Sequence, residues 1–366
     1  MRVLHIAETV KGGVSTVINS LIEKNYNYNI ESFVLAPGSQ IKFIKGGTVV
    51  EYNRTGRNVF SFIQLAMKTI KCVKEIQPDI IHLHSSFAGL IVRTLFFLNI
   101  LSMRKVKVIY TPHAFSFLMD GPKLKKIIYA KIEIFFTKYT DRIVCTSDYE
   151  YNLAIKYGID KSKLLRIYNG VDFSLHSIEP KYILAEKSVK DKINILFVGR
   201  FDFQKGYDYL LDIISQLDSD KYSFHIVGDS VVNNKTTKLN KSNVTYYGWV
   251  DNNKLNNYFQ SADFLIMPSR WESFGIVAIE AQANGLPVLA NNNSSLPEVV
   301  KDGMTGILQD FNKLDKVIDT IENTSIDTWR IYSRNSFSYV SNKFNVELTK
   351  SQYFELYLFE SSALIR

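Results

Sequence analysis

Short apolar runs alternate with longer stretches of helical periodicity along the chain, a pattern typical of parallel sheets built from βαβ units. In the first half the expected strands are almost continuously apolar, which indicates burial on both faces. These strands cover Val3–Ala7, Ser32–Ala36, Ile80–Leu83, Lys107–Thr111 and Arg142–Thr146, and helices are expected over Val14–Glu23, Ser61–Ile76, Phe87–Leu101, Leu124–Thr137 and Asp148–Tyr157. The pattern predicts a doubly wound α/β domain.

A second set of such units begins near residue 193. Its expected strands are Ile193–Val198, Ser223–Val227, Val244–Tyr247, Phe264–Met267, Pro287–Leu289 and Gly306–Leu308. Residues 173–191 are polar, charged and without clear periodicity, which is typical of a linker. We therefore predict an α/β protein of two facing, doubly wound, Rossmann-like domains with a cleft between them. Residues 1–175 would form the first domain and 176–345 the second, with a C-terminal helix at 346–366 packing back toward the first.

Composition narrows the class of protein. With 366 residues, 46% of them apolar and 22% charged, the chain can bury two cores and is not disordered. The two cysteines, Cys72 and Cys145, are too far apart in sequence for a disulfide scaffold or a cysteine-based zinc site. The first residues already form a strand pattern rather than a signal peptide, and no apolar run approaches 18 residues. We expect a cytoplasmic protein with no membrane-spanning segment.

The net charge of +8 is unevenly distributed. Residues 1–175 hold 24 Lys and Arg against 13 Asp and Glu, a balance of +11, whereas residues 176–366 hold 20 against 23, a balance of −3. This asymmetry indicates an anionic partner such as nucleic acid, phospholipid or a phosphorylated substrate, or else a surface that is basic only for solubility. Segment 123–136 mixes lysines with Ile127, Ile128, Ile132 and Phe135. It predicts either a membrane-binding surface or a helix whose apolar residues face the core.

Candidate chemistry follows the strands, because ligands of open α/β sheets lie beyond the carboxyl ends of the strands. Gly12 and Gly13 follow the first strand and open a helix, whose N-terminus can receive a phosphate; the alternative is an ordinary turn. Arg200 and Lys205 flank the loop after the first strand of the second domain. Two cations in one such loop can bind a diphosphate, although they can also be ordinary surface charges.

The loop after Phe264–Met267 leads into a helix expected from about Phe274 to Asn284. Glu272 lies in the loop, where it can accept hydrogen bonds from sugar hydroxyls or cap the helix. Glu280 lies among apolar helix positions, where a carboxylate needs a hydrogen-bonding partner such as a ribose diol, unless it is a partly exposed helix residue.

These two glutamates stand in E-x7-E spacing, and the tripeptide Ser-Phe-Gly directly follows the first of them. Together with Gly199–Gly206, this segment resembles the donor-binding domain of the family 4 retaining glycosyltransferases, also called glycosyl transferases group 1, which have the GT-B fold. Further segments resemble the family in order, namely Gly12-Gly13, Asp79–His84, Thr111–His113, Ile167–Asp172, Val227–Asp229, Tyr247–Trp249 and Gly285–Val288. The chain departs from the family at Ser294-Ser295, where the family usually has Gly-Gly.

The resemblance implies a retaining, metal-independent hexosyltransferase that needs no cofactor. Its donor would be a nucleotide diphosphate sugar, with UDP favoured, and its acceptor a glycan or an undecaprenyl-diphosphate-linked sugar in bacterial surface polysaccharide or lipopolysaccharide biosynthesis. Such an enzyme would be a peripheral protein on the anionic inner face of the cell membrane. The alternatives are a GT-B nucleotide-sugar epimerase and a basic nucleic-acid-binding module. The sequence carries no signature of nucleic-acid recognition, so we expect no nucleic-acid partner.

The resemblance also implies residue roles. Arg200 and Lys205 would stabilise the leaving diphosphate, Glu272 would orient the sugar, and His113 would lie over the sugar face; these four are the expected catalytic residues. The expected donor-binding residues are Gly12, Gly13, Asn169, Arg200, Lys205, Phe274, Gly275 and Glu280. His82 and His84 share one strand face, but two imidazoles without a third ligand do not make a zinc site, so we predict no metal site.

Overall fold

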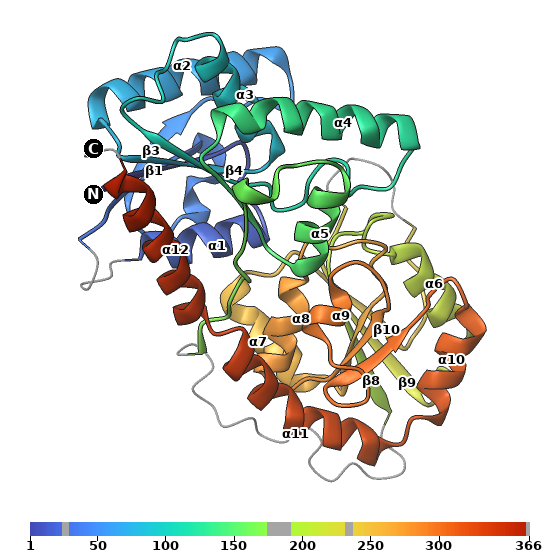
Figure 1. The fold of residues 1–366 in the computed structure, drawn as a ribbon. Coiled ribbons are helices and arrows are strands. Elements are labelled where there is room, and N and C mark those ends of the chain that lie inside the picture. The colour runs from blue at the N-terminus through green and yellow to red at the C-terminus, as the bar shows by residue number, and fades with distance from the viewer. Residues whose placement is uncertain (24–28, 174–191, 231–236, 364–366) are drawn as a thin grey trace. The chain divides into compact units, whose positions relative to one another are not determined.

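The computed structural model describes residues 1–23, 29–173, 192–230 and 237–363. The chain divides into two compact units: unit 1 comprises Met1–Asn169 with Glu347–Arg366, and unit 2 comprises Gly170–Val346. Each unit is a parallel sheet packed with helices (Figure 1). The predicted α/β class with two doubly wound sheets is therefore confirmed. The expected linker at 173–191 lies almost entirely outside the described residues.

The sheet of unit 1 has the strand order β3-β2-β1-β4-β5-β6-β7 among the described residues, and neighbouring strands are parallel. Its strands are β1 (Arg2–Ala7), β2 (Glu31–Pro37), β3 (Thr48–Tyr52), β4 (Ile80–His84), β5 (Lys107–Thr111), β6 (Arg142–Cys145) and β7 (Leu164–Arg166). The sequence pattern did not predict β3 and β7. Both are edge strands, short and partly exposed, so neither carries the continuous apolar run that identifies a central strand.

The helices of unit 1 are α1 (Gly13–Ile22), α2 (Val59–Ile76), α3 (Ser86–Phe97), α4 (Lys123–Phe136), α5 (Asp148–Lys156) and α12 (Val346–Ser362), with short 3-10 turns at Gly38–Phe43, Thr137–Tyr139 and Lys161–Lys163. The Asn58 side chain caps α2 by accepting from the Ser61 backbone N–H, and Ser147 caps α5 in the same way. Helix α3 ends at Phe97 rather than at the expected Leu101, because Asn99 takes a left-handed backbone conformation with φ 56°.

Helix α4 turns several of its large apolar residues outward. The four apolar residues expected to face either a membrane or the core are 37–48% exposed: Ile127, Ile128, Ile132 and Phe135. The buried face of α4 carries Ala130, Phe136 and Glu133. Glu133 accepts from Arg93 at 2.8 Å and from the Tyr110 hydroxyl at 3.1 Å. A buried arginine requires this partner, so the pair fixes the rotation of α4. The alternative in which these four residues pack into the core is wrong.

Helix α12 contributes side chains to the sheet of unit 1. Tyr353 and Tyr357 are fully buried, and the Tyr357 hydroxyl lies 2.6 Å from His82 Nδ1. Arg142 Nε donates to Glu360 at 2.7 Å. The chain passes between the units twice, after Asn169 and after Val346. The segments next to these two boundaries are hydrogen-bonded to each other, because Val171 N–H donates to the Phe344 carbonyl and Val346 N–H donates to the Val171 carbonyl.

Unit 2 has the strand order β10-β9-β8-β11-β12-β13 in the part of the chain described, again parallel. Its strands are β8 (Ile193–Val198), β9 (Tyr222–Val227), β10 (Val244–Gly248), β11 (Phe264–Met267), β12 (Val288–Asn291) and β13 (Gly306–Gln309), and its helices are α6 (Tyr207–Gln216), α7 (Asn252–Ser261), α8 (Ile276–Ala283), α9 (Leu296–Val299), α10 (Leu314–Asn323) and α11 (Ile326–Lys343). Trp329 of α11 is fully buried and stacks on Phe264 of β11, with ring centroids 4.3 Å apart.

The loop after β8 lies against the start of the loop after β11. Gly206 begins α6 with φ 65°, and a Cβ added there would lie 2.2 Å from the Pro268 carbonyl oxygen. No side chain fits in that space, so only glycine allows the two loops to approach this closely.

We predict that Gly206→Ala lowers the free energy of unfolding far more than Gly248→Ala. Gly248 has nearly the same φ, 66°, but nothing lies within 4 Å of an added Cβ. The control carries only the left-handed backbone cost of about 1–2 kcal/mol, whereas Gly206→Ala adds a clash with Pro268 and exceeds roughly 3 kcal/mol. Urea unfolding of both variants measures the difference, and equal losses would contradict the close packing of the loops.

Candidate active site

In unit 2, the ends of two neighbouring strands bring Lys205 and Glu272 together. Lys205 follows β8 and Glu272 follows β11, and these strands pair directly. Lys205 Nζ donates to Glu272 Oε1 at 2.5 Å, and the Ser269 hydroxyl donates to the same oxygen at 2.8 Å. Both side chains are largely buried. The carboxylate is therefore held in one orientation by a charge-assisted contact and a hydroxyl.

Arg200, the first expected diphosphate ligand, lies at the start of the same loop. Its guanidinium donates to Gln204 Oε1 at 2.7 Å and lies 3.2 Å from Asp202, yet its side chain remains 41% exposed. Gln204 in turn donates to the Trp271 carbonyl of the neighbouring loop. Arg200 is thus oriented by its own loop, and its side chain keeps exposed surface.

The Ser294-Ser295 pair, where the chain departs from the family pattern, holds the peptide of Glu272. The Glu272 backbone N–H donates to Ser294 Oγ at 2.9 Å, and the Ser295 hydroxyl donates to the Glu272 carbonyl at 3.1 Å. Ser294 adopts a left-handed φ of 54° at this position. The two hydroxyls thus give the departure a structural role, because they fix the backbone of the loop that carries Glu272.

Glu280 lies on α8, the helix that follows the Glu272 loop. Its side chain is partly exposed, and it makes no hydrogen bond to a described residue. Surrounding protein atoms remove water from the carboxyl group and raise its pKa from 4.5 to about 7. The helix begins at Ile276, after the buried Phe274 and after Gly275, rather than at the expected Phe274. An unpartnered carboxyl group here is suited to accept hydrogen bonds from a ligand.

The remaining predicted site residues belong to unit 1. Gly12 and Gly13 begin α1 after β1, and His113 follows β5 with a left-handed φ of 54°. Asn169 is buried, and its Oδ1 has no hydrogen-bond partner among the described residues. All of these residues follow strands of one parallel sheet, although no hydrogen bond joins Gly12, His113 and Asn169 in the described chain.

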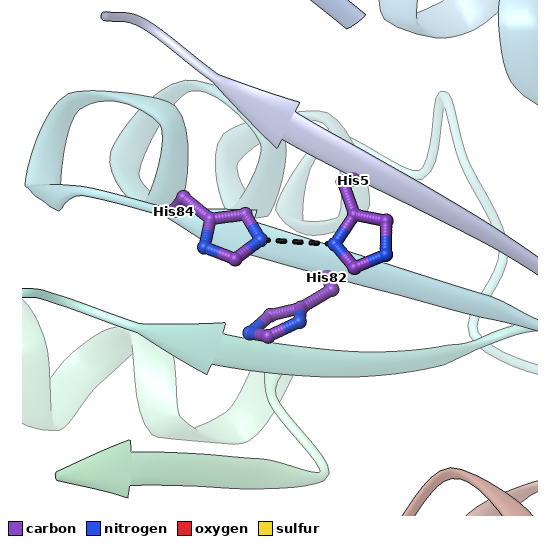
Figure 2. Close-up of side chains that lie close together, drawn as sticks. All are labelled: His5, His82 and His84. Atoms are coloured by element: carbon purple, nitrogen blue, oxygen red, sulfur yellow. Dashed lines mark hydrogen bonds between the residues drawn. The ribbon is translucent and has the colours of Figure 1, made fainter. Parts of the chain in front are cut away.

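Unit 1 also holds a histidine cluster that sequence reasoning identified only in part. His5 of β1 lies beside His82 and His84 of β4, and one ligand atom from each ring lies within 4.8 Å of the others (Figure 2). The missing third imidazole is therefore His5. The doubly wound strand order, which places β1 beside β4, was the signal that could have found it. Tyr353 and Tyr357 carried no such signal, since they come from a helix far along the chain.

Two family models match consecutive parts of the chain. The model described as Glycosyltransferase Family 4 matches residues 11–175, and the model described as Glycosyl transferases group 1 matches residues 180–339. An Escherichia coli UDP-Gal:alpha-D-GlcNAc-diphosphoundecaprenol alpha-1,3-galactosyltransferase is 30% identical over 79% of this chain and 77% of its own length. The chain belongs to the family 4 glycosyltransferases.

Another relative of this glycosyltransferase matches it from end to end. An uncharacterized 41.2 kDa protein in the cps region of Klebsiella pneumoniae is 49% identical over 98% of this chain and 99% of its own length. Among solved structures, sucrose-phosphate synthase from Thermosynechococcus elongatus superposes with a TM-score of 0.83 at 18% identity, over 99% of this chain and all of that one. This likeness supports the GT-B fold predicted from the sequence. Within the described ranges, none of the enzyme's helices combines the length and hydrophobicity needed to span a bilayer.

We predict that the stability of the glycosyltransferase falls with rising pH because of Glu280. The folded chain keeps the Glu280 proton up to about pH 7, whereas the unfolded chain releases it above about 4.5, so the unfolded state binds fewer protons between these values. Between pH 4.5 and 8 the wild type should lose roughly 2–3 kcal/mol more than Glu280→Gln. Urea unfolding across this range measures the loss, with Glu322→Gln as an exposed control. Parallel pH profiles for wild type and Glu280→Gln would contradict the raised pKa.

Proposed function

We propose that this glycosyltransferase transfers a hexose from a UDP-sugar, with retention at the anomeric carbon, to a lipid-linked sugar or glycan in bacterial surface polysaccharide synthesis. The observation that carries the proposal is the arrangement of Arg200, Lys205 and Glu272 after β8 and β11, at the carboxyl edge where ligands of such sheets bind. The names of the relatives support the substrate classes, since one lies in a cps region and another carries UDP-Gal and a diphosphoundecaprenol acceptor in its name.

The two cations match the chemistry of the leaving group. When the bond between the anomeric carbon and the diphosphate oxygen breaks, its electron pair stays on that oxygen, and the diphosphate gains one negative charge. Interactions of the diphosphate with Arg200 and Lys205 therefore strengthen as the bond breaks. The Arg200 guanidinium can donate to two oxygens at once, and Lys205 supplies a compact charge. Because Arg200 and Lys205 would neutralise the charge of the diphosphate, we propose that the transfer proceeds without a divalent metal ion.

The two carboxylates match the remaining parts of the donor. Lys205 and Ser269 occupy Glu272 Oε1, and no described residue bonds Oε2, so this oxygen can orient a sugar hydroxyl next to the N-terminus of α8 at Phe274 and Gly275. Glu280 would accept from the ribose diol, which favours its ionised form and lowers its raised pKa. In unit 1, we propose that Gly12, Gly13 and Asn169 contact the donor, and that His113 lies over the sugar.

We predict that Arg200→Ala and Lys205→Ala each lower kcat by about a hundredfold or more, the scale of losing a donor that stabilises developing charge. The assay supplies UDP-, GDP- and ADP-sugars with a diphosphate-linked acceptor in the presence of EDTA, and NMR reads the anomeric configuration of the product. Lys313→Ala and Arg330→Ala are the matched controls, because both remove a surface cation of unit 2 that pairs with an aspartate of its own segment.

Several outcomes would contradict parts of the proposal. Wild-type turnover in both Arg200→Ala and Lys205→Ala would refute the diphosphate assignment. Activity lost in EDTA and restored by Mn²⁺ or Mg²⁺ would refute metal independence, and an inverted product would refute retention. Conversion of the donor alone to an isomeric nucleotide sugar would identify an epimerase instead.

We further propose that unit 1 binds an anionic membrane through α2, α3 and α4. Apolar side chains are exposed on all three helices, from Val59 on α2 and Phe97 on α3 to Leu124 on α4, which is 70% exposed. The helices adjoin, since Phe62 stacks on Phe87 and Phe97 contacts Phe135. Two of these helices, α2 and α4, also carry several lysines, namely Lys68, Lys71, Lys74, Lys123, Lys125, Lys126 and Lys131. Exposed apolar surface edged with cations is typical of proteins that lie on anionic lipid.

We predict that the protein sediments with anionic liposomes at low salt and is released as the ionic strength rises. Each lysine near the lipid contributes about 1 kcal/mol, so replacing Lys123, Lys125 and Lys126 together with glutamate should weaken binding by at least about a hundredfold. The charge-matched control replaces Lys221, Lys301 and Lys316 of unit 2, which are exposed, with glutamate. Equal recovery with neutral and anionic liposomes would contradict the proposal, as would equal binding by the two triple variants.

A further inference from the structure

Four histidines gather in the sheet of unit 1 and just beyond the end of one of its strands. His5 comes from β1, and His82 and His84 come from β4; these three side chains are fully buried. His113 follows β5, which is the neighbour of β4 in the sheet. The parallel register places His5 opposite His82. Figure 2 shows the His5 and His84 rings pointing toward one another, joined by a hydrogen bond. The largely apolar sheet therefore contains a connected polar cluster.

Three of the rings form a chain that ends at His113. His5 Nδ1 lies 3.1 Å from His84 Nε2, and His84 Nδ1 lies 3.0 Å from His113 Nε2. Burial lowers the pKa of His5 to about 3 and of His113 to about 4, and lowers the pKa of His84 well below its ordinary value. All three rings are neutral at pH 7. A neutral imidazole has one N–H donor and one acceptor nitrogen, so the protons of the chain must all point in one direction.

The free end of the chain decides that direction. His5 Nε2 is buried and has no hydrogen-bond partner among the described residues. If the chain ran from His113 toward His5, this nitrogen would carry a proton with nothing to accept it, and buried orphan N–H groups are rarer and more costly than unused acceptors. The chain therefore runs from His5 Nδ1–H to His84 Nε2, and from His84 Nδ1–H to His113 Nε2.

We propose that His84 and His5 are positioning residues that hold His113 in its Nδ1–H tautomer. His113 Nε2 is then occupied as an acceptor, and Nδ1–H is the donor that remains for a ligand. The left-handed backbone of His113 fixes the ring at the strand end, and the relay fixes its proton. The proposal deepens the proposed function, on which it rests, because it makes His113 a neutral hydrogen-bond donor toward a hydroxyl or phosphate oxygen of the bound substrates.

The contacts of the fourth ring, His82, argue against a metal site. Its Nδ1 lies 2.6 Å from the Tyr357 hydroxyl and its Nε2 lies 2.8 Å from Thr111 Oγ1. A metal ion held by His5, His82 and His84 would displace one of these partners and break the bond between His5 and His84. No carboxylate belongs to the trio, so a buried divalent charge would also lack compensation. The hydrogen-bonded arrangement is the one that the observed contacts favour, and metal binding becomes an outcome of the test.

The first experiment measures tautomers directly. Long-range ¹H–¹⁵N correlation NMR on the full chain, with ¹⁵N-labelled histidine, assigns the protonated nitrogen of each of the six histidines. We expect Nδ1–H for His5, His84 and His113. His84→Asn keeps an amide donor near the position of Nδ1 and should preserve the His113 tautomer, whereas the nearly isosteric His84→Leu should leave His113 in mixed tautomers. His5→Asn and His5→Leu form the second matched pair, read at His84.

The second experiment measures turnover. His84→Leu should lower kcat about tenfold, the scale of one lost hydrogen bond, with a smaller change in KM, and His84→Asn should restore most of the loss. Thermal unfolding of each variant separates this effect from loss of the fold. Turnover by His84→Leu at the wild-type kcat would overturn the positioning role.

The NMR result stands apart from activity, so the two proposals fail separately. If the wild type transfers no sugar, the proposed function fails, while the His113 tautomer in His84→Leu and His84→Asn still decides the relay. An Nε2–H tautomer at His113, or an unchanged tautomer in His84→Leu, would overturn the relay. Stoichiometric zinc in the purified protein, with shifted His5, His82 and His84 resonances, would overturn it in favour of a metal site.

Discussion

The ion pair between Lys205 Nζ and Glu272 Oε1 depends on the adjacency of β8 and β11. These strands are distant in sequence, and only their parallel pairing carries both loops to the same edge of the sheet. The contact also requires Gly206, because any side chain there would collide with the Pro268 carbonyl. Ser294 and Ser295 then hold the Glu272 peptide from the loop after β12. Three strand ends thus combine to orient one carboxylate, and the proposed donor chemistry depends on that orientation.

Unit 1 depends on a different interaction, which is the hydrogen bonding of polar side chains buried inside an apolar sheet. Buried imidazoles lose their hydration and remain neutral, so each needs a hydrogen-bond partner inside the protein. Helix α12 supplies one of these partners, because Tyr357 reaches His82 and Tyr353 reaches Thr111. The C-terminal helix therefore completes the hydrogen bonding of the polar cluster in the sheet.

Several groups near the strand ends remain strained or uncompensated in the described structure. His113 and Ser294 hold left-handed backbones, Glu280 carries a raised pKa without a hydrogen-bonding partner, and Asn169 leaves a buried oxygen unpaired. Each feature costs folding free energy, and such costs concentrate where a protein binds ligands. His113, Ser294 and Asn169 follow strands of the two sheets, and Glu280 lies on the helix that follows β11. This distribution agrees with the membership of the chain in a family of glycosyltransferases.

The sequence by itself determined the α/β class, the central strands, the loops that carry Arg200, Lys205 and Glu272, and the helix that carries Glu280. Continuous apolar runs and glycine turns are local signals. The edge strands β3 and β7 lack such signals, and the pattern missed them. Only the tertiary structure decided which way α4 faces, since its rotation follows from the Arg93–Glu133 pair. Only the tertiary structure also joined His5 to His84 and gave the two serines their contacts with Glu272. These contacts depend on strand order and register, and neither quantity is encoded in any single segment.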